Sequence, residues 1–140
     1  TNDDKKIEYL LSRGVEQVLP SVDFLRSQLK SGKRLKIYTG IDPTGPFLHL
    51  GHFTWLEKLR QFQELGHEVI FLIGGFTATI GDPTGKDTTR KVLTEKEVSD
   101  NAKEYIKQAS KILSFKGLNA AKVVNNSDWL KKMNFVLVLK

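Results

Sequence analysis

Apolar residues recur at helical spacing in two short segments at the start of the chain. The first segment, residues 6–12, is followed by Arg13-Gly14, which predicts the end of a helix. The second begins after Ser21, a candidate N-cap, and ends before Gly32. We therefore expect two short helices ahead of the main fold, in a helical segment over residues 1–34.

A strand–helix–strand pattern follows. Leu35 to Tyr38 is an apolar run, and residues 49–65 repeat apolar positions at helical spacing up to Gly66. The face expected to be buried carries Phe53, Leu56, Leu59 and Phe62. Residues 69–73 are continuously apolar, which is typical of a strand buried on both faces. Such a unit predicts two parallel strands joined by a right-handed crossover.

The remainder of the chain continues this alternation. Thr94 and Glu97 form a capping-box pattern that predicts a long packing helix over residues 95–113. Val123-Val124 is consistent with a third short strand, and we expect Trp129, just after it, to lie in the core. The fold class predicted from these patterns is α/β, with a parallel sheet and flanking helices.

Composition narrows the protein class only slightly. The chain has 140 residues, enough for one domain with a core, and a net charge of +6 that permits contact with nucleic acid. The basic residues are dispersed, so a solvated surface explains the charge equally well. The sequence contains no run of 18 apolar residues that would suggest a membrane span. The absence of Cys fits a reducing compartment.

The first predicted strand runs into a loop with candidate chemistry, followed by His49-Leu50-Gly51-His52 at the start of the next helix. A helix N-terminus binds anions, and two histidines one turn apart can face one ligand. Gly51 between them would let a flat ligand approach the backbone. The pair therefore suits a phosphorus centre that gains negative charge. Two alternatives remain: ordinary surface or core histidines, and a zinc site completed by carboxylates, since only one other histidine is present.

The tetrapeptide Asp-Pro-Thr-Gly occurs twice, at residues 42–45 and 82–85, each time after a predicted parallel strand. Because ligands bind beyond the carboxyl ends of parallel strands, we expect both turns to line one crevice. The tetrapeptide is also ordinary turn chemistry, which is the alternative interpretation. Gly85-Lys86 suggests a Walker A loop, but Ile80 stands at the first glycine position and Asp87 at the Ser/Thr position.

Taken together, these motifs resemble a known family. Tyr38-x-Gly40-x-Asp42-Pro43-Thr44 followed by Leu48-His49-x-Gly51-His52 resembles the class I aminoacyl-tRNA synthetases, and most of all the tyrosyl-tRNA synthetases. Further similar stretches follow in the family's order over residues 62–67, 74–77 and 81–90. The resemblance runs from about residue 37 to residue 129.

The resemblance implies a Rossmann-like parallel sheet, the N-terminal half of a class I catalytic domain. It also implies a ligase that activates tyrosine with ATP and Mg²⁺ and transfers the tyrosyl group to tRNA(Tyr). A homodimer in the cytoplasm without membrane contact is expected for such an enzyme. Its buried polar site would discriminate tyrosine from phenylalanine, a discrimination for which the tyrosine enzyme is itself the standard example.

The resemblance also assigns roles to individual residues, with no metal held by the protein itself. The catalytic set is His49, His52, Thr44, Lys86 and Arg90. The ATP and adenylate contacts are Gly40, Asp42, Gly51 and the two histidines. The tyrosine contacts are Tyr38 for the phenol, Asp82 for the ammonium, and Thr77 and Asn126 in support.

The chain looks like part of a longer protein, with residues 35–140 forming a nucleotide-binding half-domain truncated at its C-terminus. The KMSKS loop of the family would follow Lys140, so we expect the isolated chain to be weakly active or inactive. Two rival hypotheses remain open. One is another nucleotidyl transferase with the same His-x-Gly-His motif, and the other is a non-catalytic RNA-binding module.

Overall fold

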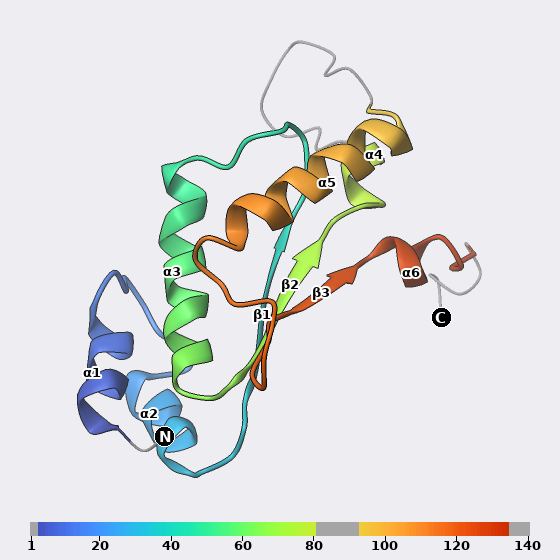
Figure 1. The fold of residues 1–140 in the computed structure, drawn as a ribbon. Coiled ribbons are helices and arrows are strands. Elements are labelled where there is room, and N and C mark those ends of the chain that lie inside the picture. The colour runs from blue at the N-terminus through green and yellow to red at the C-terminus, as the bar shows by residue number, and fades with distance from the viewer. Residues whose placement is uncertain (1–2, 81–92, 135–140) are drawn as a thin grey trace.

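The computed structural model describes residues 3–80 and 93–134. Within those residues, three parallel strands form one sheet in the order β1-β2-β3 (Figure 1). The strands are β1 (Lys36–Ile41), β2 (Glu68–Ile73) and β3 (Lys122–Asn125). The predicted α/β class with a parallel Rossmann-like sheet is thus confirmed.

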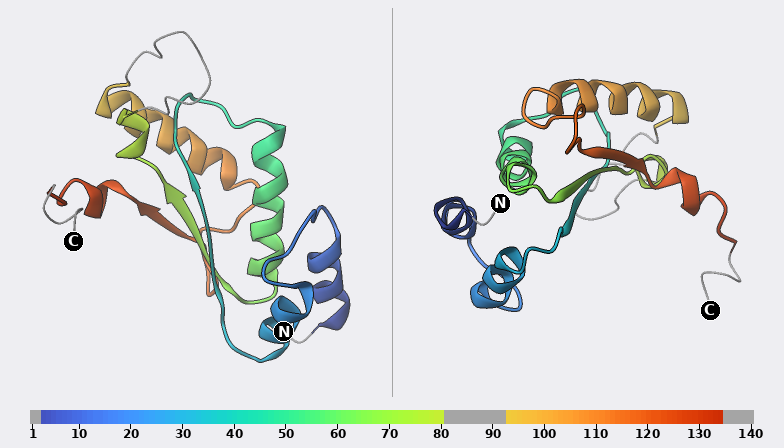
Figure 2. Two further views of the ribbon diagram at one scale, coloured as in Figure 1. Left: turned by 180° about the vertical axis from the view of Figure 1, so that it is seen from behind. Right: turned by 60° about the horizontal axis from the view of Figure 1, so that its bottom comes forward.

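Helices connect and cover the strands. The long helices are α3 (Leu50–Glu64), between β1 and β2, and α5 (Glu95–Ala109), between β2 and β3. Both lie on the same side of the sheet (Figure 2), and both contribute buried residues to a single core with it. Two single-turn helices, α4 (Thr77–Ile80) and α6 (Ser127–Leu130), follow β2 and β3 directly.

The sheet is buried on one face within the described residues. Along β2, Val69, Phe71 and Ile73 are buried, whereas the alternate residues Ile70 and Leu72 are only half-buried. The prediction that β2 is buried on both faces is therefore wrong here, because α3 and α5 lie on the same side. The open face is where the alternate side chains of all three strands point.

β1 is longer than its apolar run suggested. Its pairing with β2 runs in register from Lys36 opposite Glu68 to Ile41 opposite Ile73. Thr39, Gly40 and Ile41, expected in the loop, therefore belong to the strand. The loop to α3 begins only at Asp42. Its first polar residues therefore directly follow a strand that is paired up to its last residue.

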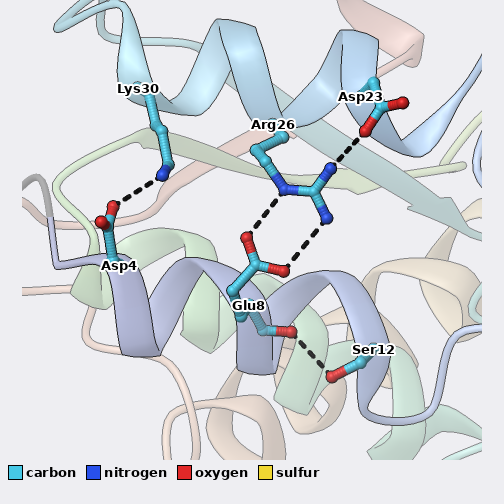
Figure 3. Close-up of polar contacts among 6 residues, drawn as sticks. All are labelled: Asp4, Glu8, Ser12, Asp23, Arg26 and Lys30. Carbon is cyan, nitrogen blue, oxygen red and sulfur yellow. Dashed lines mark hydrogen bonds and ion pairs between the residues drawn. The ribbon is translucent and has the colours of Figure 1, made fainter.

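The N-terminal segment contains α1 (Asp4–Ser12) and α2 (Val22–Lys30), the two helices predicted there. Figure 3 shows two ion pairs that join them: Arg26 contacts Glu8, and Lys30 lies 2.9 Å from Asp4. Arg26 also pairs with Asp23 of its own helix. Their exposure makes these pairs weak contributors to stability. Whether the chain divides into domains near residue 34 stays a prediction.

A partly buried polar contact attaches α1 to the main fold. The ammonium of Lys58 on α3 donates to the carbonyls of Leu10 and Arg13, at 2.7 and 2.8 Å, and to Gln61 Oε1 at 2.8 Å. Burial lowers the pKa of Lys58. The apolar face of α1 also enters the common core, so this helix packs on the main fold.

The helix starts agree with the capping signals, whereas two residues that were predicted to be buried are exposed. Ser21 caps α2, and the reciprocal capping box of Thr94 and Glu97 starts α5. α5 ends at Ala109, four residues earlier than expected, and continues as a tighter turn. Phe53 is 46% exposed and Trp129 is 43% exposed, so neither is a core residue in the described part of the chain.

No helix among the residues that the structure describes combines the length and the apolar character needed to cross a membrane.

Candidate functional site

The carboxyl ends of the three strands bring the candidate residues together. The loop from Asp42 to His49 follows β1, the Gly74-Gly75 turn and α4 follow β2, and Asn126 follows β3. This edge of a parallel sheet is where α/β proteins bind ligands. The parallel strands thus bring residues that are far apart in the sequence to one edge of the sheet.

The two histidines cap the start of α3. His49 is the N-cap residue, and its Nδ1 accepts a hydrogen bond from the Gly51 N–H at 3.1 Å. His52 Nδ1 accepts one from the His49 N–H at 3.0 Å. The two ring centroids lie 3.8 Å apart with an interplanar angle of 40°. The two rings thus lie side by side at the helix start, whereas their facing one ligand stays a prediction.

These partners determine which nitrogen of each ring carries the proton. A neutral imidazole has one acceptor and one donor nitrogen, and both Nδ1 atoms act as acceptors here. Each neutral ring therefore presents an Nε2–H donor. Two such donors beside the positive end of the α3 dipole form a site suited to an anion.

The surroundings of His52 keep it neutral. Burial, with a smaller effect from His49, lowers the pKa of His52. Its ring centroid lies 6.1 Å from Trp55 on one side and 6.1 Å from Tyr105 on α5 on the other. His52 is therefore an uncharged hydrogen-bond donor at neutral pH, held in place by aromatic neighbours.

Gly51 has a packing reason as well as a candidate ligand role. A Cβ atom at this position would lie 3.0 Å from His49 Cε1 and 3.1 Å from His49 Nδ1. The missing side chain thus allows the His49 ring to fold back over the first turn of α3. The predicted close approach of a ligand at Gly51 stays a prediction.

A chain of hydrogen bonds links the ends of the three strands. Thr77 Oγ1 donates to Asp42 Oδ1 at 2.7 Å, and Asn126 Nδ2 donates to Thr77 Oγ1 at 3.0 Å. Asn126 Oδ1 in turn accepts from the Phe76 N–H at 2.8 Å. Asp42, expected on the adenylate side, is therefore directly connected to Thr77 and Asn126, expected on the tyrosine side.

Two glycines that sequence reasoning did not place in the site leave room for polar side chains at the ends of the strands. A Cβ at Gly74 would lie 1.7 Å from Asp42 Oδ1, and one at Gly75 would lie 2.4 Å from Asn125 Oδ1. Neither position tolerates a side chain without moving the polar groups of β1 or β3. The available signal was the Gly-Gly pair immediately after a buried strand.

Three further candidates lie along β1 and its loop. Tyr38 and Gly40 occupy alternate positions of β1 on the open face of the sheet, and Tyr38 is 68% exposed. Thr44 is exposed in the loop, and its N–H donates to the Asp42 carbonyl at 2.8 Å. The histidines begin α3, which packs on the covered face, so the loop connects the two faces at the end of β1.

Three predicted site residues, Asp82, Lys86 and Arg90, lie outside the described residues. The expectation that the second Asp-Pro-Thr-Gly turn shares a crevice with the first therefore stays a prediction. Within the described ranges, no three His, Asp or Glu side chains come together as metal ligands, so the zinc alternative gains no ligand set there.

Comparisons with known proteins give a matching family and similar sequences. The model of a family described as tRNA synthetases class I (W and Y) matches residues 30–140. Tyrosine–tRNA ligases of Carboxydothermus hydrogenoformans and Colwellia psychrerythraea are 50% and 54% identical over 134 and 125 residues. These matches cover 94% and 88% of this chain but 32% and 30% of the ligases, so the chain spans about a third of their length.

The fold is similar to solved structures of tyrosyl-tRNA synthetases. A C-terminally truncated mitochondrial tyrosyl-tRNA synthetase of Aspergillus nidulans matches with a TM-score of 0.76 at 29% identity, covering 96% of this chain and 41% of that one. The tyrosyl-tRNA synthetase of Archaeoglobus fulgidus, complexed with L-tyrosine, matches with a TM-score of 0.68 at 26% identity. That match covers 97% of this chain and 38% of that one.

Proposed function

Because the chain belongs to the class I tRNA synthetases of the tryptophan and tyrosine family, we propose that it supplies the ATP-binding part of a tyrosine–tRNA ligase. The observation that carries the proposal is the histidine pair at the start of α3. Both Nδ1 atoms accept backbone N–H groups, and both Nε2–H donors are without a hydrogen-bond partner among residues 3–80 and 93–134. Tyrosine is preferred to tryptophan because the similar curated proteins carry the name tyrosine–tRNA ligase.

The proposed reaction activates tyrosine in one displacement. A carboxylate oxygen of tyrosine attacks the α-phosphorus of ATP, the bond to the β-phosphate oxygen breaks, and tyrosyl-adenylate and pyrophosphate form. The negative charge that develops on the phosphate oxygens is stabilised by the Nε2–H groups of His49 and His52 and by the α3 N-terminus. Transfer of the tyrosyl group to tRNA(Tyr) follows, with AMP released. No covalent enzyme intermediate is needed, because positioning and charge stabilisation suffice.

The remaining predicted roles are part of the same proposal. Asp42, fixed by Thr77 and Asn126, contacts the adenylate with Gly40, and Thr44 contacts the pyrophosphate. Tyr38 binds the substrate phenol. Outside the described residues, Asp82 binds the substrate ammonium, and Lys86 and Arg90 reach the pyrophosphate.

Mg²⁺, a homodimer and a cytoplasmic location complete the proposal. Mg²⁺ is commonly held mainly by substrate phosphates, where it neutralises their charge. Asp42 contributes a carboxylate to the described part of the site, and its Oδ1 already accepts a hydrogen bond from Thr77. The donor set therefore fits a metal carried by ATP better than one held in a protein cage.

The decisive experiment is tyrosine-dependent exchange of pyrophosphate into ATP. It compares the 140-residue chain, the complete ligase that contains it, and the complete ligase with His49→Ala/His52→Ala. A His67→Asn variant serves as the matched control, because His67 lies at the opposite edge of the sheet and Asn can still accept from the Leu35 N–H.

We expect exchange with tyrosine but not with tryptophan in the complete ligase, loss of exchange in the double variant, and little or none in the isolated chain. If no amino acid supports exchange in the complete protein, the ligase proposal fails. Salt-sensitive tRNA binding without ATP binding would then favour the RNA-binding alternative.

A further inference from the structure

The loop that carries the candidate anion site is held mainly by side chains of α5. Asn101 Nδ2 donates to the Pro43 carbonyl at 3.1 Å. Gln108 Nε2 donates to the Pro46 carbonyl at 2.8 Å, and Gln108 Oε1 accepts from the Leu48 N–H at 3.0 Å. These contacts join segments about sixty residues apart in the sequence.

The contacting residues share one face of α5. Asn101, Tyr105 and Gln108 are spaced four and three residues apart, which places them in a row along the helix. Tyr105, in the middle, is buried; burial raises its pKa, and a backbone hydrogen bond from Gly45 acts in the opposite direction. Its ring also neighbours His52. This row therefore touches the loop at several points and the second histidine directly.

Gln108 makes the hydrogen bond to the loop that lies next to His49 in the sequence. Its side-chain amide nitrogen donates to the Pro46 carbonyl and to the Glu104 carbonyl of its own helix, and its oxygen accepts from the Leu48 N–H. The Leu48 N–H lies one peptide before His49, which holds an extended N-cap conformation with φ −122° and ψ 178°. Fixing the backbone on this side therefore fixes the direction in which the His49 ring leaves the chain.

We propose that Gln108 is a positioning residue for the phosphate-binding histidines, acting through the loop from Pro46 to Leu48. The predicted effect on catalysis rests on the proposed function, but the predicted effect on the orientation of the His49 ring does not. α5 is then more than a packing helix: one of its faces sets the orientation of the anion site. A merely structural glutamine would affect folding without selectively affecting the ATP step.

The first test uses steady-state exchange kinetics of the complete ligase carrying Gln108→Met, which removes both polar atoms at similar volume. Gln28→Met on α2 is the matched control, since it makes the same chemical change far from the loop. We expect Gln108→Met to lower kcat about 10- to 100-fold, the range for a reacting group misplaced by about 1 Å. The KM for tyrosine should stay unchanged, and Gln28→Met should match the wild type.

The second test does not depend on catalysis. In the 140-residue chain, ¹⁵N chemical shifts of the histidine rings report which nitrogen is protonated. The wild type should show His49 with its proton on Nε2, and Gln108→Met should shift His49 toward a mixture of both tautomers. If the wild-type ligase shows no exchange while the tautomer responds, the proposed function fails and the positioning role stands.

A third variant covers the case in which Gln108→Met does not fold. Gln108→Glu keeps an acceptor for the Leu48 N–H but loses the donor to the Pro46 carbonyl, so we expect a smaller loss in kcat and a partial tautomer shift. The proposal is overturned if folded Gln108 variants keep kcat and the His49 tautomer. It is also overturned if they raise the KM for tyrosine as much as they lower kcat.

Discussion

Replacing Gly51 by Ala should separate stability from activity. The new Cβ would lie 3.0 Å from His49 Cε1 and 3.1 Å from Nδ1, closer than side-chain atoms normally approach. The His49 ring must yield by a few tenths of an ångström. That movement lengthens the 3.1 Å hydrogen bond from the Gly51 N–H to His49 Nδ1 and redirects the Nε2–H donor.

Two opposing effects on stability nearly cancel. Gly51 lies in the first turn of α3 with an ordinary backbone conformation, so alanine gains up to about 1 kcal/mol of helix propensity. Weakening the N-cap bond loses about 1 kcal/mol. We therefore expect the free energy of unfolding to change by less than about 1 kcal/mol, as measured by urea denaturation of the 140-residue chain.

The activity should fall although the fold is retained. A donor displaced from the developing charge loses most of its contribution, so exchange by the complete ligase should drop roughly 10- to 100-fold in kcat. The control is a double-mutant cycle with His49→Ala. If Gly51 acts through the His49 ring, Gly51→Ala should add no further loss once that ring is gone.

Additive losses in the cycle would show that Gly51 acts independently of His49, for example by direct contact with the nucleotide. Unchanged kcat in the single variant would refute the reasoning altogether. Additive losses would thus favour the other expectation for Gly51, close approach of a flat ligand, whereas unchanged kcat would contradict both expectations.

Two further predictions concern stability. Burial lowers the pKa of His52 and His67 below their ordinary value of 6.5, so the unfolded chain binds protons first on acidification. The free energy of unfolding should therefore fall as the pH drops from about 6.5 toward the folded-state pKa values, and His67→Asn should reduce that slope in urea titrations at several pH values. Lys58→Met removes the ammonium that bonds the end of α1, and should lower the free energy of unfolding by about 1–3 kcal/mol without changing the KM for ATP. Arg26→Met, its exposed control between α1 and α2, should change stability far less, and an equal effect would contradict the assignment.

The elements that the sequence predicted well carry local signals. Ser21, Thr94 and Glu97 mark helix starts because their side chains bond backbone N–H groups within three residues. The strands were found from short apolar runs. The site residues on β1 and α3 followed from a strand, a loop and a helix start in immediate succession.

The errors arise where burial depends on distant elements. An apolar run identifies β2, but it cannot say that α3 and α5 both lie on one side of the sheet. Phe53 and Trp129 are large and apolar, yet whether they are covered depends on what packs above them. Pattern alone therefore overestimates the core wherever no covering element can be predicted.

The function of α5 was missed for the same reason. Asn101 and Gln108 are polar residues on an amphipathic helix, where a solvated role is the ordinary expectation. Their partners are backbone groups of a loop about sixty residues earlier, and no local spacing reveals such a contact. Only the position of α5 across the end of β1 makes these side chains part of the site.

The histidine pair shows how a structural bond selects between two chemistries that the motif leaves open. Binding a metal through Nε2 would require the proton to move to Nδ1, and Nδ1 of each ring already accepts a backbone N–H at the start of α3. Moving either proton would therefore break a capping bond and set two donors against each other. Binding an anion requires no such change, because the Nε2–H donors are already formed. The capping of α3 thus favours phosphate over zinc at this pair and makes the orientation of His49 the property on which the site depends.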